Sequence, residues 1–290
     1  MGATTQNSGQ LQEREPCVVN WKGRGAMKIV VLVKQVPDTE AKIEVKPGAT
    51  SIVAENITYV VNPYDEYAVE EALRIKEKLG QGDVTVVAMG PEKATEALRT
   101  CLAMGADKGV HLKDAAFDGS DSYATALALS KALQGIPYDL VLCGKQAIDD
   151  DNAAVGIELA ELLGLPHVAA VTKLEIGVDR RSAVCHREIE GASEVVETSL
   201  PAVITAQKGL NEPRYASLKG IMTAKKKPVE VKDAASLGLA PDKVGTQGSK
   251  AKILNMSLPP QRAAGKIVPG EPPDAARQTV KLLREEAKVI

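Results

Sequence analysis

Short apolar runs alternate with longer stretches of helical apolar spacing along the first half of the chain. Runs of β-branched and aliphatic residues, typical of strands that are buried on both faces, lie at Lys28–Lys34, Asp83–Met89, Val110–Leu112 and 139–143. Apolar residues recur at helical intervals from Asn62 to about Leu79, from Pro91 to near Met104, across Ser122–Leu133 and across Ala153–Leu163. Because strands and helices alternate, the pattern predicts an α/β fold with a parallel sheet covered by helices on both faces.

After Pro166, strand-like segments follow one another with no helical pattern between them. They lie at Val168–Val171, Lys173–Ile176, Ser182–Ile189, Glu194–Thr198 and Ala202–Ala206. The turn-like Glu190–Ser193 joins the third and the fourth, which predicts a hairpin and an antiparallel extension at the edge of the sheet. We also expect an edge strand at Ile43–Val45, loop-rich structure over residues 207–224 and a further strand at Pro228–Val231.

The two ends of the chain lack this patterning. Residues 1–26 are polar and rich in Gly, Gln, Asn and Thr, so we expect a disordered extension before the first strand. Residues 232–272 carry Gly and Pro with little periodicity, and a helix is predicted at about Asp274–Lys288. A long unpatterned stretch is unusual inside a compact domain, so residues 232–290 are interpreted as an extended C-terminal arm and helix that pack on another subunit.

Composition narrows the possible functions. The chain has 290 residues, a formal net charge of −2 and 26% charged residues, which gives no electrostatic reason to expect nucleic acid or an anionic membrane as the main partner. No apolar run approaches the roughly 20 residues that a membrane span needs. The four cysteines lie far apart without CxxC spacing, so a structural zinc site is not expected. Scattered cysteines in apolar surroundings suit the reducing cytoplasm.

No set of catalytic residues stands out. His111, His167 and His186 have no serine, cysteine or carboxylate partner at a telling spacing, and each is interpreted as structural. Aromatic residues are scarce, with one Phe, one Trp and six Tyr, so little ring stacking is available for nucleic-acid bases or for a flavin. The residues alone therefore do not indicate an enzyme.

The segment from Gly144 to Asn152 (GKQAIDDDN) is the most informative part of the chain. It follows the buried run 139–143 and precedes the helical pattern at Ala153–Leu163. A strand, a glycine at its carboxyl end and a polar turn into a helix N-terminus form the arrangement in which α/β proteins hold nucleotides, because free N–H groups of the first helical turn favour a phosphate. The alternative is a plain turn in which Asp and Asn cap the helix.

Several segments, in unbroken order from Met27 to the C-terminus, resemble the β subunit of electron-transfer flavoprotein. The motifs that carry the resemblance are Met27–Gln35, NPYDEYAVEEA from Asn62 to Ala72, AMGAD from Ala103 to Asp107, GKQAIDDD from Gly144 to Asp151, LNEPRY from Leu210 to Tyr215, the run Lys225–Lys227 and PPQR from Pro259 to Arg262. NEPRY and GKQAIDDD together are highly specific for this family.

The resemblance implies a Rossmann-like fold and one half of an αβ heterodimer. In this family the redox FAD sits mainly in the α subunit, near the interface, and the β subunit of housekeeping members buries one AMP with a structural role. The dimer accepts electrons from acyl-CoA dehydrogenases and similar flavoenzymes and passes them to a quinone reductase or another acceptor. The chain is therefore expected to be an electron carrier and not an enzyme by itself.

The sequence pattern and the resemblance together give the expected organisation of the chain. A disordered extension (1–26) would precede a nucleotide-binding α/β domain with a recognition loop (27–231). The C-terminal arm and helix (232–290) would pack on the partner subunit.

The resemblance also implies a set of cofactor-binding residues. For AMP these are Leu32 on the first strand, Asn62 at the helix cap, Met89 at the end of the second strand, and, in the motif itself, Gly144, Lys145, Gln146, Ala147, Asp149, Asp151, Asn152 and Val155. Amides around Asn152–Val155 would hold the phosphate. The three carboxylates of Asp149–Asp151 should repel it, so we expect them to cap backbone N–H groups or meet the ribose. The alternative is that they are solvated acids at a helix start.

A bifurcating branch of the family holds a second FAD in the β subunit in place of AMP and takes electrons from NADH. Its motif reads more like DGDTAQVG, whereas this chain has Asp150 at the glycine position and Asn152-Ala153-Ala154 in place of Thr-Ala-Gln. These differences favour AMP. Val36–Thr39 and Val155-Gly156 resemble the bifurcating branch instead, so the alternative stays open. A third possibility is a stand-alone adenine-nucleotide sensor.

Two residues are implied to meet the α subunit. Tyr64 matches the position at which an aromatic ring of the β subunit approaches the α-subunit flavin, and the alternative is a first-turn helix residue packed under a loop. Glu188 matches a position that pairs with an α-subunit arginine near the flavin domain.

A third contact is implied with the electron donor. The segment Tyr215–Met222 matches the recognition loop of the family, with Leu218 as the anchor in a dehydrogenase pocket and Ile221 and Met222 beside it. A small apolar anchor in a mobile loop suits the weak, fast-exchanging contacts of an electron shuttle. The alternative is that Leu218 and Ile221 are buried in the core. The nearby Lys225–Lys227 would usually be only a solvated face.

Overall fold

The computed structural model describes residues 25–260 and 264–290, and these form two compact units. The larger unit runs up to Ile43 and from Ala54 to Ile253, and the smaller comprises Glu44–Val53 and Leu254–Ile290. The predicted disordered extension falls almost entirely on residues 1–24, which lie outside the described residues. The central sheet and all predicted site residues belong to the larger unit.

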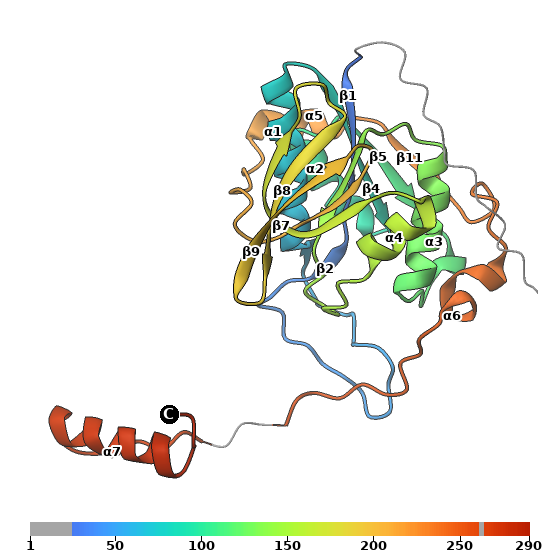
Figure 1. Cartoon of the computed structure of the whole chain (residues 1–290). Helices are drawn as coiled ribbons and strands as arrows, with labels where there is room; N and C mark the ends of the chain where they lie inside the picture. The colour runs from blue at the N-terminus through green and yellow to red at the C-terminus, as the bar shows by residue number, and fades with distance from the viewer. Residues whose placement is uncertain (1–24, 261–263) are drawn as a thin grey trace, which may run out of the picture. The chain divides into compact units, whose positions relative to one another are not determined.

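A nine-stranded sheet in the order β11-β5-β4-β1-β6-β10-β7-β8-β9 forms the centre of the larger unit (Figure 1). All neighbours from β11 to β7 pair in parallel, and β8 and β9 add an antiparallel hairpin at one edge. The strands are β1 (Met27–Leu32), β4 (Gly82–Met89), β5 (Lys108–Leu112), β6 (Leu140–Gly144), β7 (His167–Ile176), β8 (Ser182–Ile189), β9 (Ala192–Ser199), β10 (Val203–Ala206) and β11 (Val229–Lys232). A separate antiparallel ribbon consists of β2 (Gln35–Pro37) and β3 (Tyr59–Val61).

Helices cover both faces of this sheet (Figure 1). On β1, Ile29 and Val31 belong to the core that includes α1 and α2, whereas Val30 and Leu32 belong to the core that includes α3 and α4. The α/β prediction is therefore confirmed, because the buried strands carry apolar side chains on both faces. The helices are α1 (Pro63–Leu79), α2 (Ala94–Met104), α3 (Ser122–Gln134), α4 (Val155–Leu163), α5 (Leu218–Ala224), α6 (Gly245–Gly248) and α7 (Pro272–Glu285), with short 3₁₀ turns η1 (Ala115–Phe117) and η2 (Pro241–Lys243).

One local prediction is wrong and a second is incomplete. Ile43–Val45 is not a strand; the N–H of Val53 donates to Glu44 O at 2.8 Å, and the chain between them is a loop around Pro47-Gly48. Residues 207–224 are not loop throughout, because α5 occupies the last seven of them. Ser217 caps that helix by accepting from Gly220 N at 3.0 Å. A helix of two turns is too short to give a readable apolar period.

The predicted arm, residues 232–290, divides between the two units: residues up to Ile253 belong to the larger unit, where Ala234, Leu239 and Val244 are buried, and the rest belong to the smaller. Residues 250–260 have no helix or strand, and α7 comes near the end of the chain. α7 has no buried residues, and its Val280 and Leu283 are exposed. No helix in the described part of the chain is long and apolar enough to cross a membrane.

Candidate functional site

The strand order places the predicted nucleotide loop at a switch point of the sheet. From β1 the chain moves outward through β4 and β5, and it then returns across the sheet to β6 on the other side of β1. Val31 pairs with Leu142, so Leu32 and Gly144 end the two neighbouring strands at the same edge. Open α/β sheets bind ligands outside the carboxyl ends of such strands, and the segment Gly144–Asn152 begins at this crevice.

The start of α1 holds the predicted loop through two buried side chains. Asn62 is 1% exposed; its amide donates to Gln146 O at 2.9 Å and accepts from Ile148 N at 3.2 Å. The sequence predicts Asn62 as a helix cap, and it does precede Pro63, but its side chain makes no capping bond. Asn62 instead fixes the middle of the nucleotide loop.

Asp65 joins the two strands across the crevice. Its carboxylate accepts from Lys34 N at 2.7 Å and from Gly144 N at 2.8 Å. These backbone groups follow β1 and end β6, so one side chain from the first turn of α1 contacts both sides of the switch point. Asp65 is not among the site residues predicted from the sequence, because an acid in the first turn of a helix is ordinarily explained by the helix dipole.

Gly144 lies against the backbone of α1. A Cβ at this position would sit 2.5 Å from Asp65 Oδ1 and 2.7 Å from the carbonyl carbon of Tyr64. The sequence predicts that Gly144 lets a ligand come close to the backbone. In the structure the missing side chain lets α1 pack against the end of β6. Tyr64 is half-buried at this contact.

The three adjacent acids are paired within the protein. Lys34 Nζ lies 2.8 Å from Asp149 Oδ1 and 3.2 Å from Asp150 Oδ2, and Gln146 Nε2 donates to Asp151 Oδ1 at 2.6 Å. Burial lowers the pKa of Lys34, but hydrogen bonds and charge from Asp149 and Asp150 outweigh it and raise that pKa above 10.5. Lys34 is not among the site residues predicted from the sequence. Its position as a cation close after the first strand is the sequence feature that could have indicated it. These acids are expected either to cap backbone N–H groups or to meet the ribose. One capping bond is present, because Asp150 Oδ1 accepts a hydrogen bond from Asn152 N at 3.4 Å.

The loop enters α4 without a side-chain cap. Ala154 is the N-cap residue and no side chain bonds the first turn, so the interpretation in which Asp and Asn cap this helix is wrong. Asp151 and Ala153 have φ values of +50° and +51°, a conformation that non-glycine residues adopt at a cost of roughly 1 kcal/mol each. The N–H groups at the start of α4, including that of Val155, therefore remain available for an anion.

Leu32 and Met89 lie at the carboxyl ends of the neighbouring strands β1 and β4. Leu32 is buried in the core, whereas Met89 lines a cavity of about 300 Å³ together with Gly90 and Pro91. Gln35 and Tyr59, from the β2-β3 ribbon, line the same cavity. An apolar hollow therefore exists on the β4 side of β1, and the uncapped start of α4 lies on the β6 side.

Burial gives Asp65 an unusual proton affinity. It raises the pKa of Asp65 from 3.8 to about 7, against the lowering effect of the N–H groups of Lys34 and Gly144. The folded protein therefore keeps a proton on this carboxyl at pH values at which the unfolded chain releases it. The stability that the proton contributes is complete below about pH 4 and is lost as the pH rises to about 7.

We predict that Asp65→Asn removes this pH dependence. Relative to the variant, the free energy of unfolding of the wild-type protein is expected to fall by about 2 to 3 kcal/mol between pH 5 and pH 8. Urea denaturation of both proteins at the two pH values measures the difference. A gap between wild type and variant that stays constant across this range would contradict the assignment.

The predicted recognition segment is a short helix with its apolar side chains in solvent. Leu218 is 83% and Met222 73% exposed, and Ile221 and Tyr215 are also exposed. The alternative that Leu218 and Ile221 are buried in the core is therefore wrong. Glu188 is exposed on β8, where Gln207 Nε2 lies 3.5 Å from its Oε2.

The basic run after α5 is only partly a solvated face. Lys227 Nζ donates to Leu102 O at 2.9 Å and to Ala106 O at 2.6 Å, at the end of α2. Burial lowers the pKa of Lys227 below its ordinary value. Lys225 and Lys226 are exposed.

The buried histidine His111 and the three cysteines of the described residues lie inside the fold. His111 is buried, with Nδ1 3.1 Å from Thr95 Oγ1 and Nε2 3.0 Å from Gly90 O. Cys101, Cys143 and Cys185 are free and buried, and burial raises the pKa of each thiol. The part of the chain that the structure describes holds no cluster of His, Cys, Asp or Glu suited to a metal ion.

Comparisons with known proteins agree with this arrangement. Residues 50–237 match the family model of the electron transfer flavoprotein domain. The chain is 45% identical to the electron transfer flavoprotein subunit beta of Thermoanaerobacterium thermosaccharolyticum, over 89% of this chain and 98% of the relative. It is 44% identical to the protein of the same name from Bacillus subtilis, over 91% of this chain and 100% of the relative.

A further relative carries a different name. The caffeyl-CoA reductase-Etf complex subunit CarD of Acetobacterium woodii is 40% identical, over 84% of this chain and 92% of the relative. The family model and these relatives together span the sheet, the crevice at β6 and the exposed α5. The chain belongs to the electron transfer flavoprotein family, as one of its β subunits.

Proposed function

We propose that this chain is the β subunit of a heterodimeric electron carrier that works in the cytoplasm. It pairs with an α subunit that holds most of the FAD, accepts electrons from acyl-CoA dehydrogenases or related flavin dehydrogenases, and passes them to a quinone reductase or another acceptor. When bound, the FAD supplies the redox chemistry. The chain itself binds, orients and docks, and the free buried thiols support a reducing compartment.

In this proposal the crevice between β1 and β6 holds one AMP. The observation that carries it is the α4 N-terminus without a side-chain cap, placed at a switch point and preceded by two left-handed residues. N–H groups at Val155 and its neighbours would bind the phosphate. Leu32 and Met89 would contribute apolar contact to the adenine.

Pairing of the acids within the protein weakens the main objection to a phosphate at this place. Lys34 offsets one of the two charges of Asp149 and Asp150, and Gln146 donates a hydrogen bond to Asp151. Two net negative charges are therefore left among the four ionised groups Lys34, Asp149, Asp150 and Asp151. Lys145, in the same loop, adds a further cation within the motif. The remaining motif residues, Gly144, Ala147 and Asn152, shape the backbone around the ligand.

A second candidate is the bifurcating carrier, with a second FAD in the β subunit and NADH as electron donor. The resemblance of Val36–Thr39 and Val155-Gly156 to that branch favours it. The side chain of Asp150 argues against it, because it replaces the glycine of the bifurcating motif. Tyr64, at the contact between α1 and the loop, would lie near a flavin in either case.

Nucleotide content separates the two candidates. The chain co-expressed with its α subunit would be purified as the heterodimer, denatured, and its released nucleotides measured by chromatography. We expect about one FAD and one AMP per dimer. Two FAD and no AMP would establish the bifurcating carrier, and a stable solitary chain that binds AMP reversibly would establish a sensor.

A further inference from the structure

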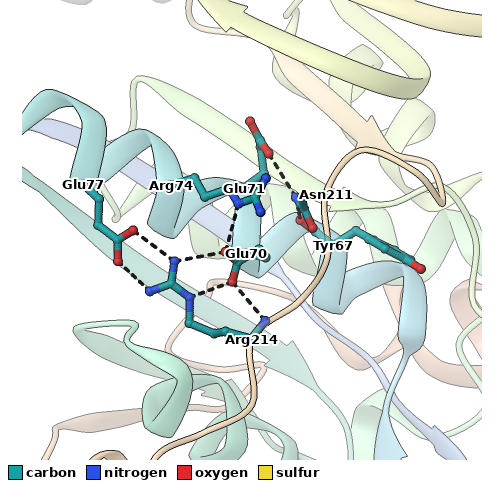
Figure 2. A network of polar contacts seen from close by, with 7 residues as sticks. All are labelled: Tyr67, Glu70, Glu71, Arg74, Glu77, Asn211 and Arg214. Atoms are coloured by element: carbon teal, nitrogen blue, oxygen red, sulfur yellow. Dashed lines mark hydrogen bonds and ion pairs between the residues drawn. The ribbon is translucent and has the colours of Figure 1, made fainter.

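A network of ion pairs joins α1 to the segment that leads into α5 (Figure 2). Glu70 is 3% exposed and its carboxylate accepts from Arg214 at three places: the backbone N at 3.2 Å, Nε at 2.7 Å and Nη2 at 3.0 Å. The far side of the same guanidinium binds Glu77, with Nη1 2.5 Å from Oε1 and Nη2 3.0 Å from Oε2. Arg214 therefore bridges two residues that lie about two turns apart on α1. Pairs of this bidentate kind are the stronger ones among charged hydrogen bonds.

A second contact holds the same segment three residues earlier. Asn211 is buried, and its Nδ2 donates to Tyr67 O and to Glu71 Oε2, both at 3.0 Å (Figure 2). With Asn211 and Arg214 both bound to α1, the chain is fixed at two points shortly before Ser217 begins α5.

The other end of α5 is bound to α2. Arg99 Nη1 donates to Ala224 O at 2.7 Å and to Lys227 O at 2.8 Å. Gly220, in the middle of the helix, leaves no room for a Cβ against Ala103 O. α5 is thus held at both ends and underneath, and its exposed Leu218 and Met222 have no part in holding it.

We propose that Glu70 and Arg214 are positioning residues that fix α5 in the geometry in which it docks the electron donor. This inference rests on the proposed function, in which Leu218 is the docking anchor. A segment that is ordered before docking avoids the entropy loss of ordering it on contact. Loss of the network therefore weakens donor binding and leaves the electron-transfer step itself unchanged.

Arg74 offers a matched control. It is also a cation on the Glu70 carboxylate, with Nε 3.0 Å from Oε1, but it lies on α1 four residues away and does not bind the segment before α5. Arg74→Gln therefore removes a charge from Glu70 without releasing the docking segment. Arg214→Lys keeps the charge and loses the planar fork.

The test uses the intact heterodimer and two readouts. Amide hydrogen exchange of residues 218–224 reports the order of α5, and steady-state reduction by a short-chain acyl-CoA dehydrogenase with butyryl-CoA reports docking. For Arg214→Gln and Glu70→Gln we expect exchange in α5 to rise at least about fivefold and KM for the dehydrogenase to rise about tenfold, with kcat and bound nucleotide unchanged. Arg214→Lys should fall between these variants and wild type, and Arg74→Gln should match wild type.

A double variant shows whether the two residues act through α5. If they do, Leu218→Ala/Arg214→Gln has the same KM as Leu218→Ala alone. Additive effects, or wild-type exchange and KM in Arg214→Gln, overturn the positioning role, as does loss of nucleotide or kcat with KM unchanged. An unchanged KM in Leu218→Ala would instead overturn the docking role on which this inference rests.

Discussion

Gly144→Ala is expected to remove most of the bound nucleotide from the heterodimer and to lower its stability by about 3 kcal/mol. The added Cβ would lie 2.5 Å from Asp65 Oδ1 and 2.7 Å from the Tyr64 carbonyl carbon. Backbone atoms cannot rotate away from it, so α1 must move off β6. That movement breaks the bond from Gly144 N to Asp65 and displaces Asn62 from the loop.

Gly135→Ala is the matched control for this prediction. Gly135 lies at the C-terminal end of α3, and its φ is −96°. An added Cβ there would come no closer than 3.6 Å to other atoms. Thermal unfolding and nucleotide content, measured for both variants, test the argument. Full nucleotide content in Gly144→Ala would show that the ligand does not depend on the contact between α1 and β6.

Leu218→Ala is expected to raise KM for the donor dehydrogenase about 30-fold while leaving the heterodimer, its flavin absorbance and its melting temperature intact. Leu218 is 83% exposed, so its truncation opens no cavity in the core. The side chain stands at the first position of a helix that is already ordered by Ser217 and by the contacts with α1 and α2. The loss therefore falls on the interface alone.

Val178→Ala serves as the control for Leu218→Ala. Val178 is a fully exposed apolar residue in the turn between β7 and β8, away from α5 in the sequence. Its truncation should leave KM at the wild-type value. If both variants behave like wild type, α5 is not the docking segment and another exposed face of the heterodimer meets the donor.

Patterns within single elements were predictable from the chain alone. Apolar runs located the strands of the central sheet, although the predicted strands Val168–Val171 and Lys173–Ile176 form the single strand β7, and helical apolar spacing located α1 to α4. These signals are local, because side-chain periodicity and capping depend on neighbours a few residues away. The same reasoning failed for Ile43–Val45, where suitable residues have no neighbouring strand to pair with.

The candidate site was predicted in part. The motif at Gly144 and the candidate anchor Leu218, which is exposed in the structure, were selected from the sequence and its resemblance to the family. The contacts that support them were not: Lys34 binds Asp149 across 115 residues, Asp65 binds Gly144 across 79, and Arg214 binds Glu70 across 144. Nothing in the spacing of charged residues indicates which of many acids a given base will meet.

The amino-acid sequence by itself therefore determined the α/β class, the family and the location of the candidate nucleotide motif. Each of these depends on a local pattern or on a contiguous motif. Only the tertiary structure decided that α1 packs against Gly144, that Lys34 pairs with Asp149 and Asp150, and that contacts with α1 and α2 hold α5 in place. These contacts form where the parallel sheet brings together the ends of strands that are distant in the sequence. The order of residues along the chain does not show which strand ends become neighbours.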